Sequence, residues 1–339
     1  MDSLTHIVLG ACIGEVVAGK QLGKKAWLVG AVLQTIPDLD FIAGFWLSPA
    51  EDLLAHRGFT HSFLFVILIS LLLASLLSRM RWGAGLSTSS WLFFCLTGTL
   101  MHLLLDAMNV YGTVWFEPFS HIRIAFNVLF VADPFFTMPL LVACLLLLFF
   151  KKTTINKRMI AQAALTLSFL YIFFASITKW QVNQVVKENL NKSTKAVVNY
   201  FSTPTPFNPW LWYVVEKVDT TFRMGYYSVF DSSNQIRFST LQQHKSLLPL
   251  AADQESLTHL IRFSQGYYAL KKENGSIVLN DLRFGKIMGW SQPNAPFVFY
   301  FYLHKSADNQ VVIQRGRMKG WSVSASKEFI RRIFSIHAQ

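Results

Sequence analysis

The stretch AHRGFTHS, residues 55–62, stands directly in front of an apolar run that extends from Phe63 to Leu77. It places two histidines, an arginine and two hydroxyl side chains at the edge of a segment apolar enough to enter a membrane. Ionisable side chains at such an edge are energetically costly and usually functional, and histidine is the commonest metal ligand. The stretch therefore predicts a polar site at the end of a membrane helix.

The composition of the 339-residue chain is that of a membrane protein. Hydrophobic residues make up 52% of the chain and charged residues 15%, and the mean hydropathy is +0.35, which is more apolar than an ordinary soluble domain. The net charge is +12, but Lys and Arg lie mainly in short loops between apolar runs. This distribution is typical of membrane topology, so we expect a membrane partner and no nucleic acid.

Several classes of protein are excluded by the motifs that the chain lacks. It has no GxSxG elbow, P-loop, HExxH motif or glycine-rich dinucleotide signature, so nucleotide-binding, acyl-serine and zinc-protease functions have no support. Cys12, Cys95 and Cys144 all lie in apolar segments without a CxxC pair, which favours packing over a disulfide or a cysteine-based zinc site. The N-terminus has no basic region before its apolar stretch and does not resemble a cleaved signal peptide.

Six apolar segments precede residue 180, and about 20 apolar residues are needed for one helical crossing. The third, fourth and sixth segments are long enough. The first is short and carries His6, and the second is interrupted by Pro37, so either can be re-entrant where its backbone is buried in protein. The segments are 3–19, 26–47, 62–78, 88–108, 135–150 and 159–178. We expect a multi-pass α-helical membrane domain with about four to six transmembrane or re-entrant helices.

The loops between these segments divide the basic residues unequally. If all six segments cross, nine Lys and Arg lie on one side, while the short loops of the other side hold only Arg57 and Arg123. By the positive-inside rule the nine are cytoplasmic. They are Lys20, Lys24, Lys25, Arg79, Arg81, Lys151, Lys152, Lys157 and Arg158. The loops 48–61 and 109–134, and the chain after residue 179, are then expected outside.

The composition changes at about residue 180, after which no long apolar run occurs. Asn274-Gly275 is a hairpin signal between two strand-like patches, and residues 327–337 have the spacing of an amphipathic helix. The strand-like patches are 222–230, 267–271, 277–279, 297–303 and 311–313. We therefore expect a membrane-embedded domain over residues 1–179 and a small extracytoplasmic α+β domain over residues 180–339.

Two features near the start of the second domain bear on its attachment. The proline-rich stretch 203–210 is expected to be an extended linker. Trp210 is its last residue, and Trp212 and Tyr213 follow it closely. Aromatic residues of this kind often form a belt at the membrane interface, and we expect that role for these three.

Residues with metal-ligand chemistry converge on one face of this predicted topology. They come from five segments, and the topology itself was set from Lys and Arg alone. His102 and Asp106 are four residues apart and therefore share one helix face, while Pro37 suggests a break that lets both neighbouring aspartates point to one site. The converging residues are His6, Asp38, Asp40, His56, His61, His102, Asp106 and Asp133.

A metal site explains this convergence better than isolated polar contacts do. Four carboxylates near a low-dielectric boundary raise one another's pKa or require a cation. Mixed imidazole and carboxylate ligands suit zinc, and also manganese or iron, and one or two divalent ions are expected. Two ions about 3.5–4 Å apart suit phosphoester hydrolysis. The alternative for any single residue is a helix–helix hydrogen bond.

The spacing of these motifs resembles the YdjM-like family of bacterial inner-membrane proteins, described as membrane-bound metal-dependent hydrolases. The resemblance covers about residues 1–135. It rests on Asp2 with Thr5-His6, PDLD at 37–40, HRGFTHS at 56–62, HLLLD at 102–106 followed by Tyr111-Gly112, and Asp133-Pro134. It implies a protein of the bacterial inner (cytoplasmic) membrane with metal ligands His6, Asp38, Asp40, His56, His61, His102 and Asp106. It implies nothing about the domain after residue 180.

The resulting hypothesis is a metal-dependent hydrolase that attacks an ester or phosphoester of a lipid-like substrate at the outer face of the membrane. Arg57 is expected to hold the anionic group, and Asp38, Asp40 or Asp133 to act as general base; the catalytic candidates are Asp38, Asp133 and Arg57. The alternative is a non-enzymatic membrane protein, because Asp and His chains also mark the ion pathways of transporters and sensors. A third alternative is a scaffold whose outer domain binds partners, in which the metal would only stabilise the fold.

Overall fold

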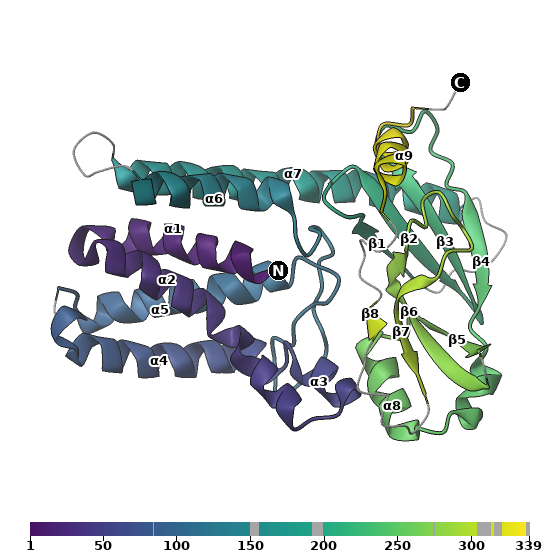
Figure 1. Ribbon diagram of the computed structural model, residues 1–339, viewed down its shortest axis with the longest axis horizontal. Coiled ribbons are helices and arrows are strands. Elements are labelled where there is room, and N and C mark those ends of the chain that lie inside the picture. The colour runs from purple at the N-terminus through teal and green to yellow at the C-terminus, as the bar shows by residue number, and fades with distance from the viewer. Residues whose placement is uncertain are drawn as a thin grey trace. The chain divides into compact units, whose positions relative to one another are not determined.

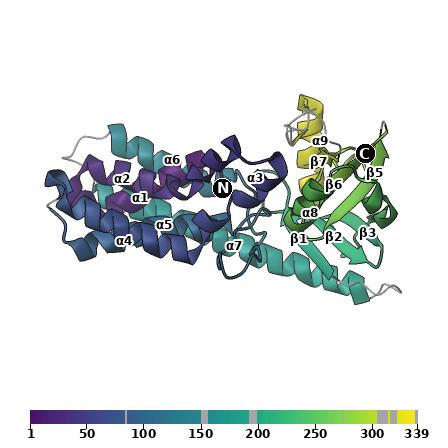
Figure 2. The ribbon, with the colours of Figure 1, turned by 90° about the horizontal axis from the view of Figure 1, so that it is seen from below.

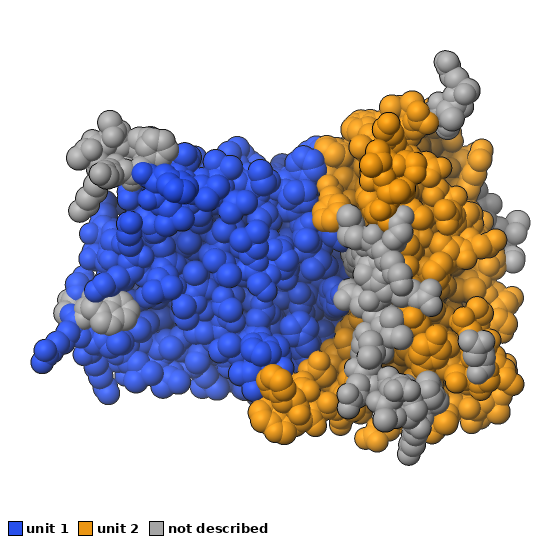
Figure 3. Space-filling view, viewed as in Figure 1, with its two compact units in different colours: residues 1–42, 55–176 blue, residues 43–54, 177–339 orange. Residues whose placement is uncertain are grey.

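The computed structural model describes residues 1–83, 85–149, 156–191, 199–273, 275–303, 313–314 and 321–336. It divides into two compact units, shown in different colours in Figure 3. Unit 1 comprises residues 1–42 and 55–176, and unit 2 comprises residues 43–54 and 177–339. The N-terminal region is helical and apolar, and the C-terminal region contains two antiparallel sheets, which confirms the predicted fold class at this level.

The helices of unit 1 run along one another in both ribbon views (Figures 1 and 2). Among the described residues, α1, α5 and α7 are long and apolar enough to cross a membrane, and two bent helix pairs raise this number to five. The fifth predicted segment, 135–150, corresponds to α6, which has 16 residues. The elements are α1 (Ser3–Leu22), α2 (Lys24–Thr35), η1 (Pro37–Phe45), α3 (Pro49–Ala55), η2 (Phe59–His61), α4 (Phe63–Arg79), η3 (Arg81–Gly83), α5 (Thr88–Asp106), α6 (Pro134–Phe149) and α7 (Lys157–Asn191).

Both bends have a local cause. Pro37 has no backbone N–H and its ring clashes with the preceding turn, so α2 ends at Thr35 and η1 continues at 51° to it. Ser62 adopts an extended backbone and its side chain accepts a hydrogen bond from the Phe65 N–H at 3.1 Å, so α4 starts afresh at 57° to the preceding helix pair. The polar motifs PDLD and HRGFTHS therefore occupy the breaks, where the backbone is not committed to a continuous helix.

Glycines bring α1 and α2 into close contact. A Cβ placed on Gly10 would lie 2.2 Å from the Gly30 carbonyl oxygen, and one on Gly14 would lie 2.0 Å from that of Ala26. Small residues allow this kind of backbone approach between membrane helices. The contact fixes His6 of α1 relative to the end of α2.

The outer surface of unit 1 is apolar where a soluble protein would be polar. Ile67, Leu68 and Leu71 of α4 and Leu170 and Phe173 of α7 are all exposed. Contiguous apolar surface of this extent marks a membrane or partner contact. It is the surface expected of helices that face lipid.

Unit 2 contains two four-stranded antiparallel sheets whose strands follow chain order (Figure 1). Its core includes the fully buried Trp212, Phe222 and Leu282. The first sheet comprises β1 (Asn199–Pro204), β2 (Leu211–Val218), β3 (Thr221–Ser228) and β4 (Phe238–Gln242), and the second β5 (Tyr268–Glu273), β6 (Ser276–Lys286), β7 (Phe297–Tyr302) and β8 (Ile313–Gln314). Its helical elements include η4 (Lys245–Leu250), α8 (Gln254–Phe263) and α9 (Val323–Ile333), together with nearly all of α3 and the end of α7.

The structure corrects two expectations about the start of this region. Trp212 and Tyr213 are not part of an interfacial belt; they lie in β2 and are buried, because this strand is covered on both faces. The stretch 203–210 is not a linker. Thr203 and Pro204 belong to β1, and the Thr205 N–H donates to the Leu211 carbonyl at 2.9 Å, so the stretch connects two paired strands.

Other expectations for this region are met in part. The predicted hairpin connects β5 to β6, with Gly275 at φ 81°, while Asn274 lies outside the described residues. The predicted final helix begins earlier, at Val323, and His337 lies outside the described residues. The last membrane segment continues as α7 to Asn191, well beyond residue 178.

Candidate metal centre

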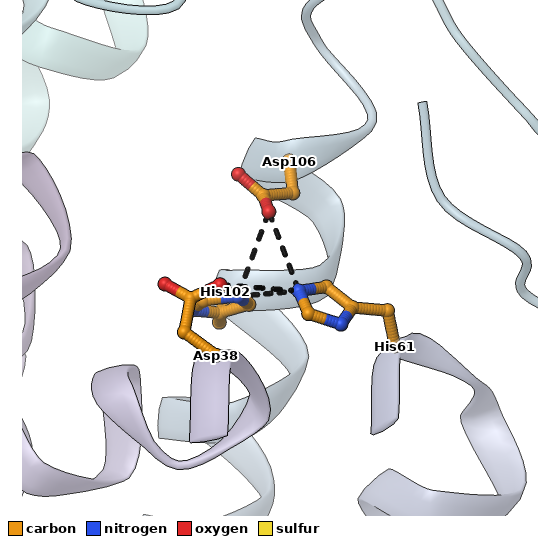
Figure 4. A group of neighbouring side chains, drawn as sticks. All are labelled: Asp38, His61, His102 and Asp106. Atoms are coloured by element: carbon orange, nitrogen blue, oxygen red, sulfur yellow. Dashed lines mark hydrogen bonds and ion pairs between the residues drawn. The ribbon is translucent and has the colours of Figure 1, made fainter. Parts of the chain in front are cut away.

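Four of the predicted ligand residues form one buried group: Asp38, His61, His102 and Asp106. Asp38 comes from η1, His61 from η2, and the other two from successive turns of α5. Figure 4 shows the four side chains pointing toward a common point. One ligand atom from each residue lies within 4.8 Å of all the others.

The distances between these atoms match those of a tetrahedral site. The two Nε2 atoms of His61 and His102 are 3.0 Å apart. Asp38 Oδ1 lies 3.5 Å from each Nε2, and Asp106 Oδ2 lies 3.4 Å from His61 Nε2 and 3.6 Å from His102 Nε2. A tetrahedral ion with bonds of about 2.0–2.2 Å separates its ligand atoms by about 3.3–3.6 Å. Four of the five separations lie in or near this range, and the two Nε2 atoms are closer together, so the group is close to the size that one zinc-sized ion requires.

Hydrogen bonds orient both imidazoles toward this point. His102 Nδ1 lies 2.5 Å from the Gln34 carbonyl oxygen, so it must donate there, and the neutral ring then presents a lone pair at Nε2. His61 Nδ1 lies 3.0 Å from Thr60 Oγ1 and 3.4 Å from Asp40 Oδ2. These acceptors hold the proton of His61 on Nδ1, so its Nε2 also presents a lone pair. Metal-ligating histidines are commonly fixed in this way by a carbonyl or carboxylate.

Asp40 organises the loop that carries His61. Its carboxylate accepts hydrogen bonds from the Arg57 N–H at 2.8 Å and Thr60 Oγ1 at 3.1 Å, and it pairs with His56 Nδ1 at 2.9 Å. Arg57 itself adopts φ 62°, a left-handed conformation that is rare outside glycine and often found at functional sites. Asp40 and His56 thus lie beside the four-residue group and support it.

His6 lies on the other side of Asp106. Its ring stacks on His102 with centroids 3.9 Å apart, and its Nε2 lies 3.1 Å from Asp106 Oδ1. The Gln34 amide donates to the Gly98 carbonyl at 2.9 Å and turns its Oε1 to His6 Nδ1 at 3.0 Å. The Met1 amino group also contacts Asp106 Oδ1.

Arg57 is buried next to the group and does not extend into solvent. Its Nε lies 3.1 Å from Asp106 Oδ2 and its Nη1 donates to Asn109 Oδ1 at 2.9 Å, while the guanidinium lies over the Tyr111 ring, 5.1 Å from its centroid. It therefore offsets part of the negative charge of the carboxylates.

Asp133 has a different set of contacts. It accepts from the Phe135 N–H at 3.0 Å at the start of α6 and from the Tyr171 hydroxyl at 2.8 Å, and it does not belong to the four-residue group. Of the seven predicted metal ligands and three predicted catalytic residues, the structure brings Asp38, His61, His102 and Asp106 together, places Asp40, His56, His6 and Arg57 in contact with them, and places Asp133 elsewhere in unit 1.

Sequence reasoning missed Gln34, Thr60 and Asn109. Each is polar within or beside the motifs, and Gln34 and Asn109 are fully buried. A glutamine inside the apolar segment 26–47 was an available signal, because an uncharged buried amide needs hydrogen-bond partners. Its two partners on different helices could not be identified from spacing.

The structure offers a direct test of whether the group fits a cation. Asp106 Oδ2 is buried and accepts no hydrogen bond among the described residues, although it faces two imidazole Nε2 atoms. Arg57 Nε, 3.1 Å away, forms an ion pair but no hydrogen bond with this oxygen, and a buried carboxylate oxygen without a hydrogen bond is energetically costly. A divalent ion between these atoms would satisfy the oxygen and both imidazole lone pairs, so the residues present fit a metal.

Comparison with known proteins covers the same part of the chain. The family model described as YdjM inner membrane protein matches residues 1–182. The Inner membrane protein YbcI of Escherichia coli (strain K12) is 31% identical over 122 residues, which are 35% of this chain and 69% of the relative. The Uncharacterized protein YfhP of Bacillus subtilis (strain 168) is 29% identical over 142 residues, 40% of this chain and 42% of the relative. No solved structure matches the chain.

Proposed function

Because this chain belongs to the YdjM inner membrane protein family, we propose that its buried His/Asp group holds a divalent metal and that it is a hydrolase of the bacterial inner membrane. The proposed substrate is an ester or phosphoester of a lipid-like molecule. The observation that carries the proposal is the four-atom arrangement around Asp106 Oδ2, in which both imidazoles present lone pairs to a carboxylate oxygen that accepts no hydrogen bond among the described residues.

The proposed ligands are Asp38, His61, His102 and Asp106, and zinc is the metal that two imidazoles and two carboxylates in this arrangement suit best. A bound divalent ion supplies Lewis acidity and makes water a nucleophile near neutral pH. Asp40 holds the His61 proton away from the centre, and the Gln34 carbonyl does the same for His102. His6 and His56 support the ligands through Asp106 and Asp40.

Asp38 is the proposed general base as well as a ligand, and it would act through Oδ2, because Oδ1 is the oxygen that faces the two imidazoles. Its side chain is 23% exposed, whereas those of the other three group members are fully buried, so water and substrate reach it first. A carboxylate next to the reacting water can accept its proton. Arg57 lies within 3.1 Å of Asp106, so an anionic group of the substrate at the centre would meet its guanidinium.

The surroundings of the group favour a substrate that is dissolved in lipid. Leu39 and Phe41, which alternate with the two aspartates of PDLD, are 47% and 58% exposed, and Phe59 of HRGFTHS is 44% exposed. Exposed apolar side chains next to a polar site mark a surface that meets an apolar partner. A lipid-like molecule could therefore present its ester to the group while its chains remain in the membrane.

We further propose the orientation that follows from the charges of the loops. The loops with many Lys and Arg face the cytoplasm, which places the polar group near the outer face and the domain over residues 180–339 outside. Labelling of single cysteines introduced at Gln254 and at Lys24 with a membrane-impermeant reagent tests this. Reaction at Gln254 alone in intact cells is expected, and reaction at Lys24 alone contradicts the orientation.

Activity is tested with the purified full-length protein, supplied with zinc and assayed on a panel of lipid phosphoesters and carboxylic esters. His61→Ala is expected to reduce the rate at least about 100-fold, since ligand loss removes the metal. The matched control is His121→Ala, an exposed histidine of the same unit that pairs with Glu117. Equal zinc-dependent activity in the wild type and both variants contradicts the proposal.

A further inference from the structure

Unit 2 contains a pocket that has no part in the proposed hydrolysis. Its volume is about 620 Å³, within the range of sites for small-molecule ligands. The wall is formed by the ends of β3 and β6, the start of β4 and the last turn of α9. Every lining residue belongs to unit 2.

The charged residues of the wall are predominantly basic. Arg237, Lys286, Arg331 and Arg332 line the pocket, and Asp231 is the acidic residue among its described lining. Arg332 is committed to Asp231 through two hydrogen bonds, Nη1–Oδ1 at 2.7 Å and Nη2–Oδ2 at 3.0 Å. The other three cations therefore leave an excess of positive charge around the pocket.

Three cations of the wall are placed to receive an anion. Arg237, just before β4, and Arg331, in α9, are exposed. Lys286, at the end of β6, is half-buried and donates one hydrogen bond to the Pro293 carbonyl, and burial lowers the pKa of its ammonium. An anion beside it would offset the lost hydration of that charge.

Two buried donors in the same wall lack acceptors. The Tyr213 hydroxyl and the Trp290 Nε1–H are buried and have no hydrogen-bond partner among the described residues. Tyr213 is 3% exposed, and burial raises the pKa of its hydroxyl well above the usual value, so it stays a donor. Buried donors without acceptors are rare in folded proteins, and here both border a cavity large enough to hold an acceptor.

We propose that this pocket binds a phosphate-ester ligand, with Arg237, Lys286 and Arg331 around the phosphate and with Tyr213 and Trp290 as hydrogen-bond donors. A phosphate carries up to two charges and several acceptor oxygens, and the planar guanidinium donates to two of them at once. The aromatic rings of Tyr226 and Trp290 in the wall provide a surface for the less polar part of the ester. The ligand is either a soluble phosphate ester or the headgroup of a phospholipid.

The test uses the full-length protein in the presence of EDTA, so that phosphate cannot bind through a metal in unit 1. Glycerol phosphate is titrated calorimetrically into protein in neutral detergent. Retention of phosphatidylglycerol against phosphatidylcholine is measured by native mass spectrometry of protein released from mixed nanodiscs. Binding in the first measurement identifies a soluble ester, and selective retention in the second identifies a headgroup.

The double variant Arg237→Gln/Arg331→Gln is expected to weaken whichever binding is seen by at least about tenfold, since two charge-assisted contacts are lost. Both side chains are exposed, so the fold should persist. The matched control, Arg262→Gln/Lys272→Gln, removes two exposed cations of the same unit outside the pocket and is expected to bind as the wild type does. Trp290→Phe should weaken binding about fivefold through loss of one donor.

Two results would overturn the proposal. One is a wild type that neither binds glycerol phosphate nor prefers phosphatidylglycerol. The other is binding that the double variant in the pocket and the control variant reduce equally, which would mean general attraction of anions to a basic surface. Neither result bears on metal binding by Asp38, His61, His102 and Asp106.

Discussion

In unit 2 three buried or partly buried carboxylates each lie against an arginine of their own, whereas in unit 1 the carboxylates outnumber the cationic side chains beside them. Among the described residues of unit 2, these three arginine pairs have N–O distances of 2.6, 2.7 and 3.2 Å. They are Asp281–Arg283, Asp231–Arg332 and Glu216–Arg223. In unit 1, Asp38, Asp40 and Asp106 converge, and among the described residues the Arg57 guanidinium and the Met1 amino group both contact Asp106, while Arg57 contacts Asp40 only through its backbone N–H.

This difference distinguishes carboxylates that are neutralised by an arginine of the fold from carboxylates that are arranged to bind a cation. A buried ion pair with its own partner is balanced within the chain. Carboxylates that share one guanidinium and face imidazole lone pairs need an added cation or must take up protons. These carboxylates of unit 2 are therefore balanced within the chain, while the polar group of unit 1 has the charge and the geometry to accept a cation.

The largest effect is expected where a pair in unit 2 is broken. Arg283→Met leaves Asp281 buried and unpaired, and loss of one partner of a buried pair costs about 3–5 kcal/mol. Thermal and denaturant unfolding of the purified protein should show this destabilisation. Replacing both residues, Asp281→Leu/Arg283→Met, should recover most of it. A cost below about 1 kcal/mol for the single variant would mean that the pair is not balanced as described.

Removal of metal should produce the next largest effect, and only where unit 1 is intact. At a metal concentration of 1,000 times Kd, binding to the folded state stabilises it by about 4 kcal/mol. EDTA should therefore lower the melting temperature of the wild type by several degrees and leave that of Asp106→Asn unchanged. The same shift in both proteins would place the metal outside this group.

A smaller effect is expected from the residues that orient the ligands. Asp40→Asn removes the carboxylate that holds His61, His56 and the Arg57 N–H, and loss of such a partner typically reduces metal affinity 10–100-fold. Competition with a fluorescent chelator measures this. Asp133→Asn is the matched control, a buried carboxylate of the same unit whose contacts are with Tyr171 and α6. Equal losses in the two variants would contradict the assignment.

The smallest effect concerns the partly exposed pair of unit 2. Burial acts to raise the pKa of Asp231, but hydrogen bonds from Arg332 and Ser335 outweigh it and lower that pKa. A carboxylate whose pKa is lowered in the folded state stabilises the fold at pH values above its unfolded pKa of about 3.9. This stabilisation is lost as the pH falls through the folded-state pKa. Asp231→Asn should cost about 1 kcal/mol at pH 7. Unfolding at a series of pH values should show this difference shrinking below about pH 4, and a constant difference would contradict it.

Much of the unit 1 group could be predicted because its determinants are local. The four-residue spacing of His102 and Asp106 places them on one helix face. Pro37 predicts the helix break that lets Asp38 point toward them. The roles within the set could not be predicted. Whether a histidine binds the centre or supports it depends on the partner of its other ring nitrogen, and for His102 that partner is a carbonyl 68 residues away in the chain.

The start of unit 2 shows a different limit. The sequence from Leu211 to Val218 is almost continuously apolar, and a strand buried on both faces lacks the alternation that identifies a half-buried strand. The aromatic residues at its beginning suit a membrane interface equally well, so composition alone could not distinguish a belt from a core. The pairing of β1 with β2 decides it.

The central claim is that Asp38, His61, His102 and Asp106 bind one metal ion. Elemental analysis of the purified full-length protein tests it most directly, with the wild type, His61→Ala and the exposed-histidine control His121→Ala prepared side by side. The account predicts about one zinc-class ion per chain in the wild type and the control and almost none in His61→Ala. Equal metal content in all three proteins, or no metal in the wild type after purification without chelators and with added zinc, would contradict it.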